Sequence, residues 1–236
     1  MNGALVFIAA GAGLAALGVV LFFAPVLIAR RRHGPGIDSE RLAATVGAFP
    51  RLTTAEQRRL ATQVRGFLRH KRFTASGQAV PDIIRLAVAG NACLLRLGKD
   101  ADCFPDVREI ALEGGDDPPS RVGLAWTAVE DAMSRSPANP VIRAFAARLA
   151  DQRTAHPRNR CAAEYPEKWW RQFNALATDR AAREALPALA GAETPDALFL
   201  DTSEMFFQSP DVLANAHNPL YRLMTEFYGV TLNRTG

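Results

Sequence analysis

The side chains that usually carry metal or nucleophilic chemistry are few and scattered in this sequence. Its four histidines are His33, His70, His156 and His217, and no two of them stand four residues apart, the spacing that places two imidazoles on one face of a helix. His156 and Cys161 lie close in sequence, but the segment between them has no helix signal to fix their geometry. We therefore interpret the four histidines as solvated surface residues.

Two hydroxyl side chains raise the alternative of nucleophilic catalysis. Thr202 and Ser203 lie between Asp201 and Glu204. A serine or threonine nucleophile needs a neighbouring base, and no histidine or lysine is placed nearby in the sequence. We therefore expect packing and helix capping, rather than catalysis, from these two residues.

The composition predicts one folded domain that binds no nucleic acid. The chain has 236 residues, 48% of them hydrophobic, which is enough to bury one sizeable core. The net charge is +4, but Arg30–Arg32 supply three of the 28 positive side chains and leave 25 against 24 negative ones. A nucleic-acid binder usually needs a concentrated basic face. The three cysteines, Cys93, Cys103 and Cys161, show no C-x-x-C spacing and suit a reducing compartment.

The start of the chain predicts a membrane anchor. Ala4–Ala29 carries no charge and is longer than the roughly 20 residues that span a hydrocarbon core. A cleavable signal peptide is the alternative, but its apolar region is usually about 7–15 residues long and follows a basic stretch, and nothing basic precedes Arg30. Because Arg30–Arg32 follow the apolar run, the positive-inside rule predicts an external amino terminus and a cytoplasmic domain. We expect a single-pass protein of the inner (cytoplasmic) membrane.

The rest of the chain is expected to form one helical domain with a small sheet. Residues 1–29 are the expected anchor, 30–48 a basic juxtamembrane segment and linker, 49–230 the folded domain and 231–236 a tail. Thr53 and Glu56 have the spacing of a capping box, which predicts the start of an amphipathic helix. The expected helices span 53–72, 82–97, 141–152, 196–207 and 220–228. The expected strands, 107–112 and 122–126, are separated by a turn rich in glycine and proline and predict an α+β fold that is predominantly helical.

Five stretches, taken in order, resemble the MtfA-like family of zinc-dependent peptidases. They are LTTAEQRRL at 52–60, FLRHKRF at 67–73, AGNACLLRL at 89–97, SEMFF at 203–207 and LYRLMTEFY at 220–228. The resemblance implies a zincin-like domain of the gluzincin type and a zinc cofactor. It also implies a protein partner, since MtfA itself binds a transcriptional repressor.

The zinc ligands of that family are missing at the matching positions. The family carries H-E-x-x-H on one helix and a ligating glutamate on a later helix, which leaves an open position for water on the metal. In this sequence the two histidine positions are Arg143 and Ala147, the glutamate position is Ala144, and the third-ligand position is Ala197. Arginine stays protonated and alanine offers no lone pair. We therefore expect no bound zinc and no catalytic residues, although a register shift of one turn in the later helix would leave a stray carboxylate.

Three functions follow as hypotheses. The first is a catalytically inactive relative of the peptidases that acts as a protein-binding or regulatory module. The others are an active metallopeptidase with a relocated metal site and a purely structural membrane subunit. In the first case, removal of the metal leaves acidic side chains unbalanced, so we expect Arg143 to pair with Asp201 or Glu204 and to hold the two helices together. The alternative is that Arg143 turns to solvent.

Overall fold

The computed structural model describes residues 37–99, 104–114, 118–133, 138–154, 167–179, 184, 186, 189 and 191–232. The elements within these ranges belong to one compact unit, Asp38–Gly236. The expected anchor at Ala4–Ala29 lies outside the described residues. Among the helices that are described, none is long and apolar enough to cross a bilayer.

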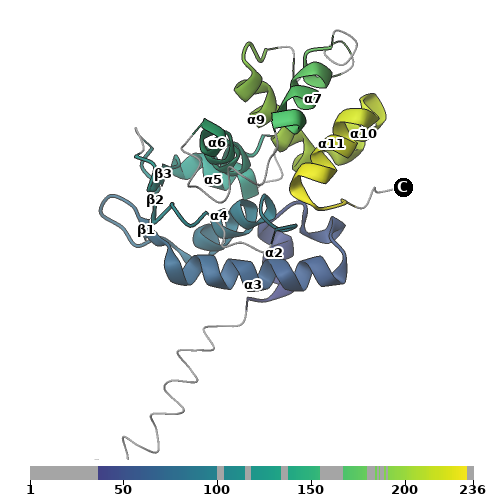
Figure 1. Ribbon diagram of the computed structural model, residues 1–236. Helices are drawn as coiled ribbons and strands as arrows, with labels where there is room; N and C mark the ends of the chain where they lie inside the picture. The colour runs from purple at the N-terminus through teal and green to yellow at the C-terminus, as the bar shows by residue number, and fades with distance from the viewer. Residues whose placement is uncertain are drawn as a thin grey trace, which may run out of the picture. The chain divides into compact units, whose positions relative to one another are not determined.

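The first group of helices surrounds α4 (Figure 1). Its members are α2 (Ser39–Thr45), the 3₁₀ turn η1 (Phe49–Arg51), α3 (Thr54–His70), α4 (Asp82–Leu94), α5 (Trp126–Met133) and α6 (Pro140–Thr154). Every residue of α4 from Leu86 to Leu94 is buried, as the apolar sequence predicts for a central helix. Helix α3 packs against it through a stripe that includes Leu60, Val64 and Phe67. The predicted capping box of α3 is present, since Thr53 and Glu56 bond each other's backbone N–H groups.

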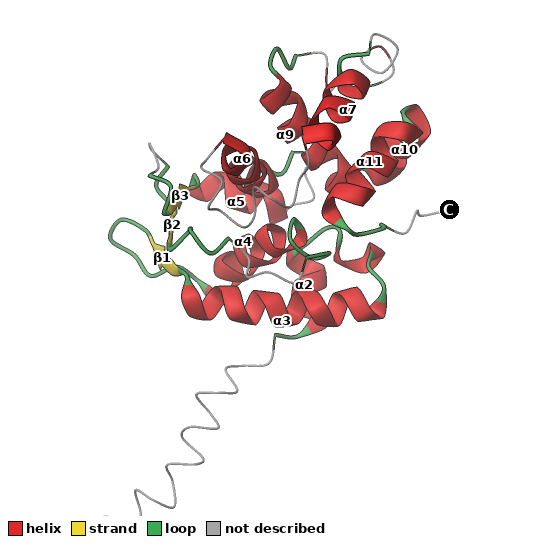
Figure 2. Cartoon of the chain, in the orientation of Figure 1, coloured by secondary structure: helices red, strands yellow, loops and turns green. Residues whose placement is uncertain are grey.

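A three-stranded parallel sheet borders this group (Figure 2). Its strands are β1 (Arg72–Thr74), β2 (Glu109–Ala111) and β3 (Arg121–Gly123), in that order. Phe73 pairs with Ile110, and Ile110 with Val122. The predicted pairing of the two later strands is therefore confirmed, and so is a mostly helical α+β arrangement. Strand β1 was not expected from the sequence.

The second group of helices closes on an aromatic cluster. Its members are α7 (Glu167–Ala177), α9 (Pro195–Gln208), α10 (Pro210–Ala216) and α11 (Asn218–Tyr228). Trp169 stacks on Phe173 with ring centroids 5.4 Å apart, and Phe227 lies 4.5 Å from Trp169 and 5.2 Å from Phe199. Since large aromatic side chains dominate core burial, this cluster holds α7, α9 and α11 together.

Contacts between residues far apart in the chain join the two groups. Helix α6 packs along α9, and Arg51 forms an ion pair with Asp211 at 2.7 Å. At a further contact, the turn after α4 meets the end of α11 backbone to backbone. A Cβ at Gly98 would lie 2.2 Å from the carbonyl oxygen of Tyr228 and 2.6 Å from the carbonyl carbon of Gly229. Only glycine fits this approach, because real Cβ atoms do not come so close to backbone.

Several predicted boundaries differ from the structure. The expected linker at 30–48 contains helix α2, whose Leu42 is fully buried, and the expected tail at 231–236 contains Leu232, which is 1% exposed. Apolar side chains therefore extend the core in both directions along the chain. Trp126 was wrongly placed at the end of a strand, because it is the first residue of α5. Helix α4 begins at Asp82 as expected, with Pro81 as its N-cap, but it ends at Leu94 and not at residue 97.

The close approach at Gly98 gives a stability test. Gly98→Ala should destabilise the protein by about 3 kcal/mol, since a methyl group forced against backbone must displace it. The matched control is Gly66→Ala in α3, where a Cβ meets nothing within 4 Å. That change should stabilise the protein by about 0.5–1 kcal/mol, because glycine inside a helix loses more backbone entropy on folding. Urea unfolding followed by tryptophan fluorescence measures both, and equal effects of the two variants would contradict the packing described.

Candidate functional site

Helix α6 begins at a buried asparagine. Asn139 is fully buried, and Pro140 follows it at the first helical position. The Oδ1 atom of Asn139 accepts a hydrogen bond from the backbone N–H of Ile142 at 3.1 Å, so Asn139 is the N-cap. Its Nδ2 donates to Oδ1 of Asn91 on α4 at 3.0 Å. The start of α6 is therefore tied directly to the central helix.

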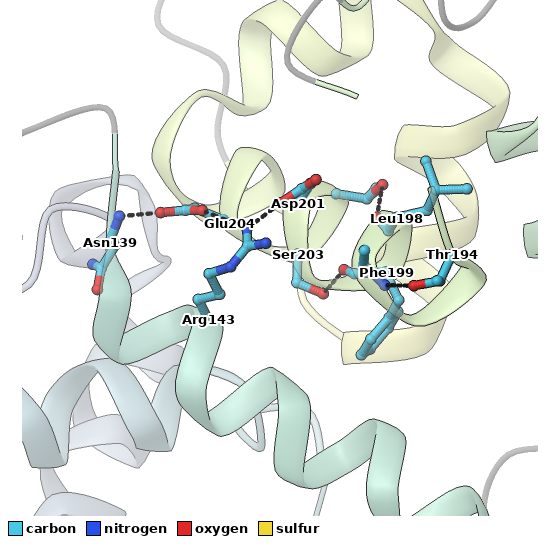
Figure 3. A network of polar contacts seen from close by, with 10 residues as sticks. Asn139, Arg143, Thr194, Leu198, Phe199, Asp201, Ser203 and Glu204 are labelled. Carbon is cyan, nitrogen blue, oxygen red and sulfur yellow. Dashed lines mark hydrogen bonds and ion pairs between the residues drawn. The ribbon is translucent and has the colours of Figure 1, made fainter. Parts of the chain in front are cut away.

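A carboxylate from α9 completes this helix start. The backbone N–H of Asn139 donates to Oε1 of Glu204 (Figure 3). In a capping box the helix's own third residue supplies this acceptor, but here that residue is Ile142, which has none. Glu204 supplies the acceptor from the neighbouring helix instead. Its negative charge also lies at the positive end of the α6 dipole, where it is stabilised.

Arg143 lies one turn further along α6 and points at the same part of α9 (Figure 3). Its Nη1 bonds Oδ1 of Asp201 and lies 3.6 Å from Oε2 of Glu204. The Arg143 side chain is 43% exposed, whereas those of Asp201 and Glu204 are 17% and 15% exposed. The structure thus brings together the three side chains of the hypothesised pairing, and the guanidinium does not turn away into solvent.

The other positions of the family's zinc motif carry methyl groups. Ala144 and Ala147 are half-buried on α6. Ala197 lies in the first turn of α9, where its N–H bonds the Thr194 hydroxyl that caps the helix. The α9 residue that meets Arg143 is Asp201, one helical turn after Ala197. The residue that contacts Arg143 is therefore not Ala197, which the sequence register assigned to the third-ligand position.

The donors present do not fit a zinc ion. A catalytic zinc site needs three protein ligands with available lone pairs. At this site the guanidinium and the three alanines offer none, and the two carboxylates already bind Arg143 and the N–H of Asn139. Within the described ranges, no group of three or more His, Cys, Asp or Glu side chains is arranged to hold a metal ion.

The remaining sequence candidates have structural roles where they are described. Thr202 and Ser203 are fully buried and donate to the carbonyls of Leu198 and Phe199, one turn back along α9, at 2.7 and 2.6 Å. This geometry agrees with the packing role expected for them. His217 caps α11, because its Nδ1 accepts from the backbone N–H of Leu220 at 3.1 Å.

Only part of the predicted histidine and cysteine set can be placed. His70 is exposed at the end of α3, and Cys93 is fully buried in α4. His33, His156, Cys103 and Cys161 lie outside the described residues. The role of Asn139 was missed at the sequence level, although an Asn-Pro pair before an apolar run is a recognisable helix start.

A family model described as glucose-regulated metallo-peptidase M90 matches residues 28–116. This segment of the chain is therefore similar to the MtfA-like peptidase family. The match contains three of the five stretches, at 52–60, 67–73 and 89–97, and confirms the resemblance over that segment. The matched segment ends before α5, so the α6 positions of the zinc motif lie beyond it. No curated protein matches the sequence significantly.

The charge cluster of Arg143, Asp201 and Glu204 gives the second test. Arg143→Met should destabilise the fold by about 2 kcal/mol, because it leaves two largely buried carboxylates without their cation. Adding Asp201→Asn and Glu204→Gln to that variant should restore part of the loss, since the unbalanced charge is then gone. Denaturant unfolding of the single and triple variants measures the difference.

Arg222→Met on α11 is the matched control, because Arg222 is exposed and no ion pair is recorded for it among the described residues. It should change stability by less than about 0.5 kcal/mol. An Arg143→Met variant as stable as this control would show that the ion pair does not hold α6 to α9.

Proposed function

We propose that this protein is a non-catalytic, membrane-anchored member of the MtfA-like family that acts as a protein-binding or regulatory module. The observation that carries the proposal is the position of Arg143. Its guanidinium occupies the expected place of the first zinc-binding histidine and bonds Asp201, a carboxylate of the facing helix. A permanently charged group without a lone pair cannot ligate a metal ion.

The same group also opposes metal binding electrostatically. A divalent cation in this place would have to compete with the guanidinium for Asp201 and Glu204, at separations where like charges repel strongly in partly buried surroundings. The proposal is therefore that the ion pair performs the mechanical part of the metal's role. It cross-links α6 and α9, which the zincin-type architecture of the family joins through zinc.

Hydrolysis needs more than a metal ion. A zinc peptidase of this kind uses the glutamate of H-E-x-x-H as the base that activates water. The matching residue here is Ala144, which can accept no proton. Recognition of a polypeptide needs neither group, so a binding role is compatible with these residues and hydrolysis at this place is not.

The proposed location follows from the amino-terminal sequence. The uncharged run Ala4–Ala29 and the arginines after it support an inner-membrane anchor with the folded unit in the cytoplasm. A protein partner would then be a cytoplasmic or membrane protein. A purely structural subunit differs from this proposal in having no partner whose binding depends on the α6–α9 face.

Metal content tests the proposal most directly. The whole chain, purified in mild detergent, should contain well under 0.1 zinc per chain and should not cleave peptides, because α6 supplies no lone-pair donor at the motif positions. Atomic absorption and a fluorogenic peptide assay measure the two quantities. About one tightly bound zinc per chain, lost together with peptide cleavage on chelation, would replace the proposal with an active metallopeptidase.

A restored motif provides the positive control. A triple variant that introduces H-E-x-x-H into α6, beside Asp201, should bind about one zinc per chain. Its substitutions are Arg143→His, Ala144→Glu and Ala147→His. The matched variant Arg143→Gln, Ala144→Gln, Ala147→Gln should gain none. If the restored chain folds but takes up no zinc, α6 is not the counterpart of the metal-binding helix.

A further inference from the structure

One face of α3 consists of arginines that point away from the core. Arg58, Arg65 and Arg69 are exposed and follow the i, i+7, i+11 spacing that places side chains on one side of a helix. Leu60 and Phe67, on the opposite side, are fully buried against the rest of the unit. The three guanidinium groups therefore project outward over about 16 Å of helix length. We call these residues the α3 basic face.

The charge of this face is not neutralised within the part of the chain that the structure describes. No ion pair is recorded there for Arg58, Arg65 or Arg69. The only acidic side chain of α3 is Glu56, and its carboxylate is already bonded to the hydroxyl and N–H of Thr53. Unpaired charges of one sign along an exposed helix raise the local positive potential. Such a face suits an anionic surface.

The chain itself limits how far this face can lie from a bilayer. The expected anchor ends at Ala29, and α2 begins at Ser39, ten residues later. Ten residues span at most about 35 Å when fully extended. Helix α2 packs against α3, so the anchor of the proposed function would keep α3 within reach of the headgroups.

We propose that the α3 basic face docks on the anionic phospholipid headgroups of the membrane that holds the anchor. This inference rests on the membrane attachment in the proposed function and adds an orientation to it. The attraction of each arginine to an anionic leaflet contributes about 1 kcal/mol of binding free energy. Three arginines therefore raise the ratio of docked to undocked chains roughly 100-fold over that on a neutral bilayer. The attraction is screened by salt, because the face is exposed.

A lipid surface fits this face better than a nucleic acid does. The folded part of the chain is nearly neutral overall, and nucleic-acid binders need a concentrated basic surface with groups that read or stack on bases. The α3 basic face contains arginines and Thr62 but no aromatic side chain. Three arginines along a helix can neutralise phospholipid headgroups at a membrane surface without any group that reads or stacks on bases.

The test places a fluorescent donor at Thr62→Cys in the whole chain, reconstituted in nanodiscs that contain acceptor-labelled lipid. Thr62 is exposed on the basic face, Cys93 is fully buried, and Cys103 and Cys161 are replaced by serine in every sample. Energy transfer should be higher in discs with about one third phosphatidylglycerol than in discs of phosphatidylcholine alone. It should fall again in 0.5 M NaCl.

A matched pair of charge variants identifies the face. The first triple variant should abolish the difference in energy transfer between the two kinds of nanodisc, because it removes all three charges of the face. Its substitutions are Arg58→Gln, Arg65→Gln and Arg69→Gln. The control Lys168→Gln, Arg171→Gln, Arg222→Gln removes the same charge from exposed positions on α7 and α11 and should leave the difference intact. Equal transfer in both lipids, or equal loss in both triple variants, would overturn the docking proposal.

Carbonate extraction separates this inference from the proposed function. If the chain stays in membranes at high pH but its energy transfer does not depend on the lipid, the anchor is supported and only the docking proposal is refuted. If carbonate releases the chain from membranes, the membrane attachment itself is refuted, and the docking proposal falls with it.

Discussion

A guanidinium between two carboxylates connects the two halves of this molecule where α6 meets α9. The local charges nearly balance: Asp201 and Glu204 contribute two negative charges, Arg143 one positive charge, and the N-terminus of α6 roughly half a positive charge through the N–H of Asn139. Because the carboxylates are largely buried, they need these partners. The helix start, the helix contact and the ion pair therefore depend on one another.

In the proposed function, this arrangement takes over the structural role that zinc has in the resembled peptidases. A metal ion joins helices by binding several ligands at once, and Arg143 does so by meeting two acceptors from a neighbouring helix. The proposal includes no substitute for the catalytic role, because water activation needs a Lewis acid and a base. It therefore combines a stable scaffold with the loss of hydrolysis.

Helix α4 lies between this cluster and the α3 basic face. It packs against both α6 and α3, and its almost uniformly apolar surface matches its burial on all sides. Asn91 is a polar exception on α4, and it is hydrogen-bonded to the N-cap of α6. On one side, helix α4 therefore fixes the orientation of α6, which packs against α9. On its other side it packs against α3, whose outer face is exposed.

The sequence by itself determined what depends on neighbouring residues. The capping box at Thr53, the apolar character of α4, the helices after Pro140 and Pro195, and the lack of lone-pair donors at Arg143, Ala144 and Ala147 are all local properties. The tertiary structure alone decided the rest, because it depends on residues far apart in the chain. It added β1 to the sheet and extended the core to Leu42 and Leu232. It also decided between the two expected partners of Arg143, since the packing of α9 against α6 makes Asp201 the hydrogen-bonded carboxylate and leaves Glu204 at 3.6 Å.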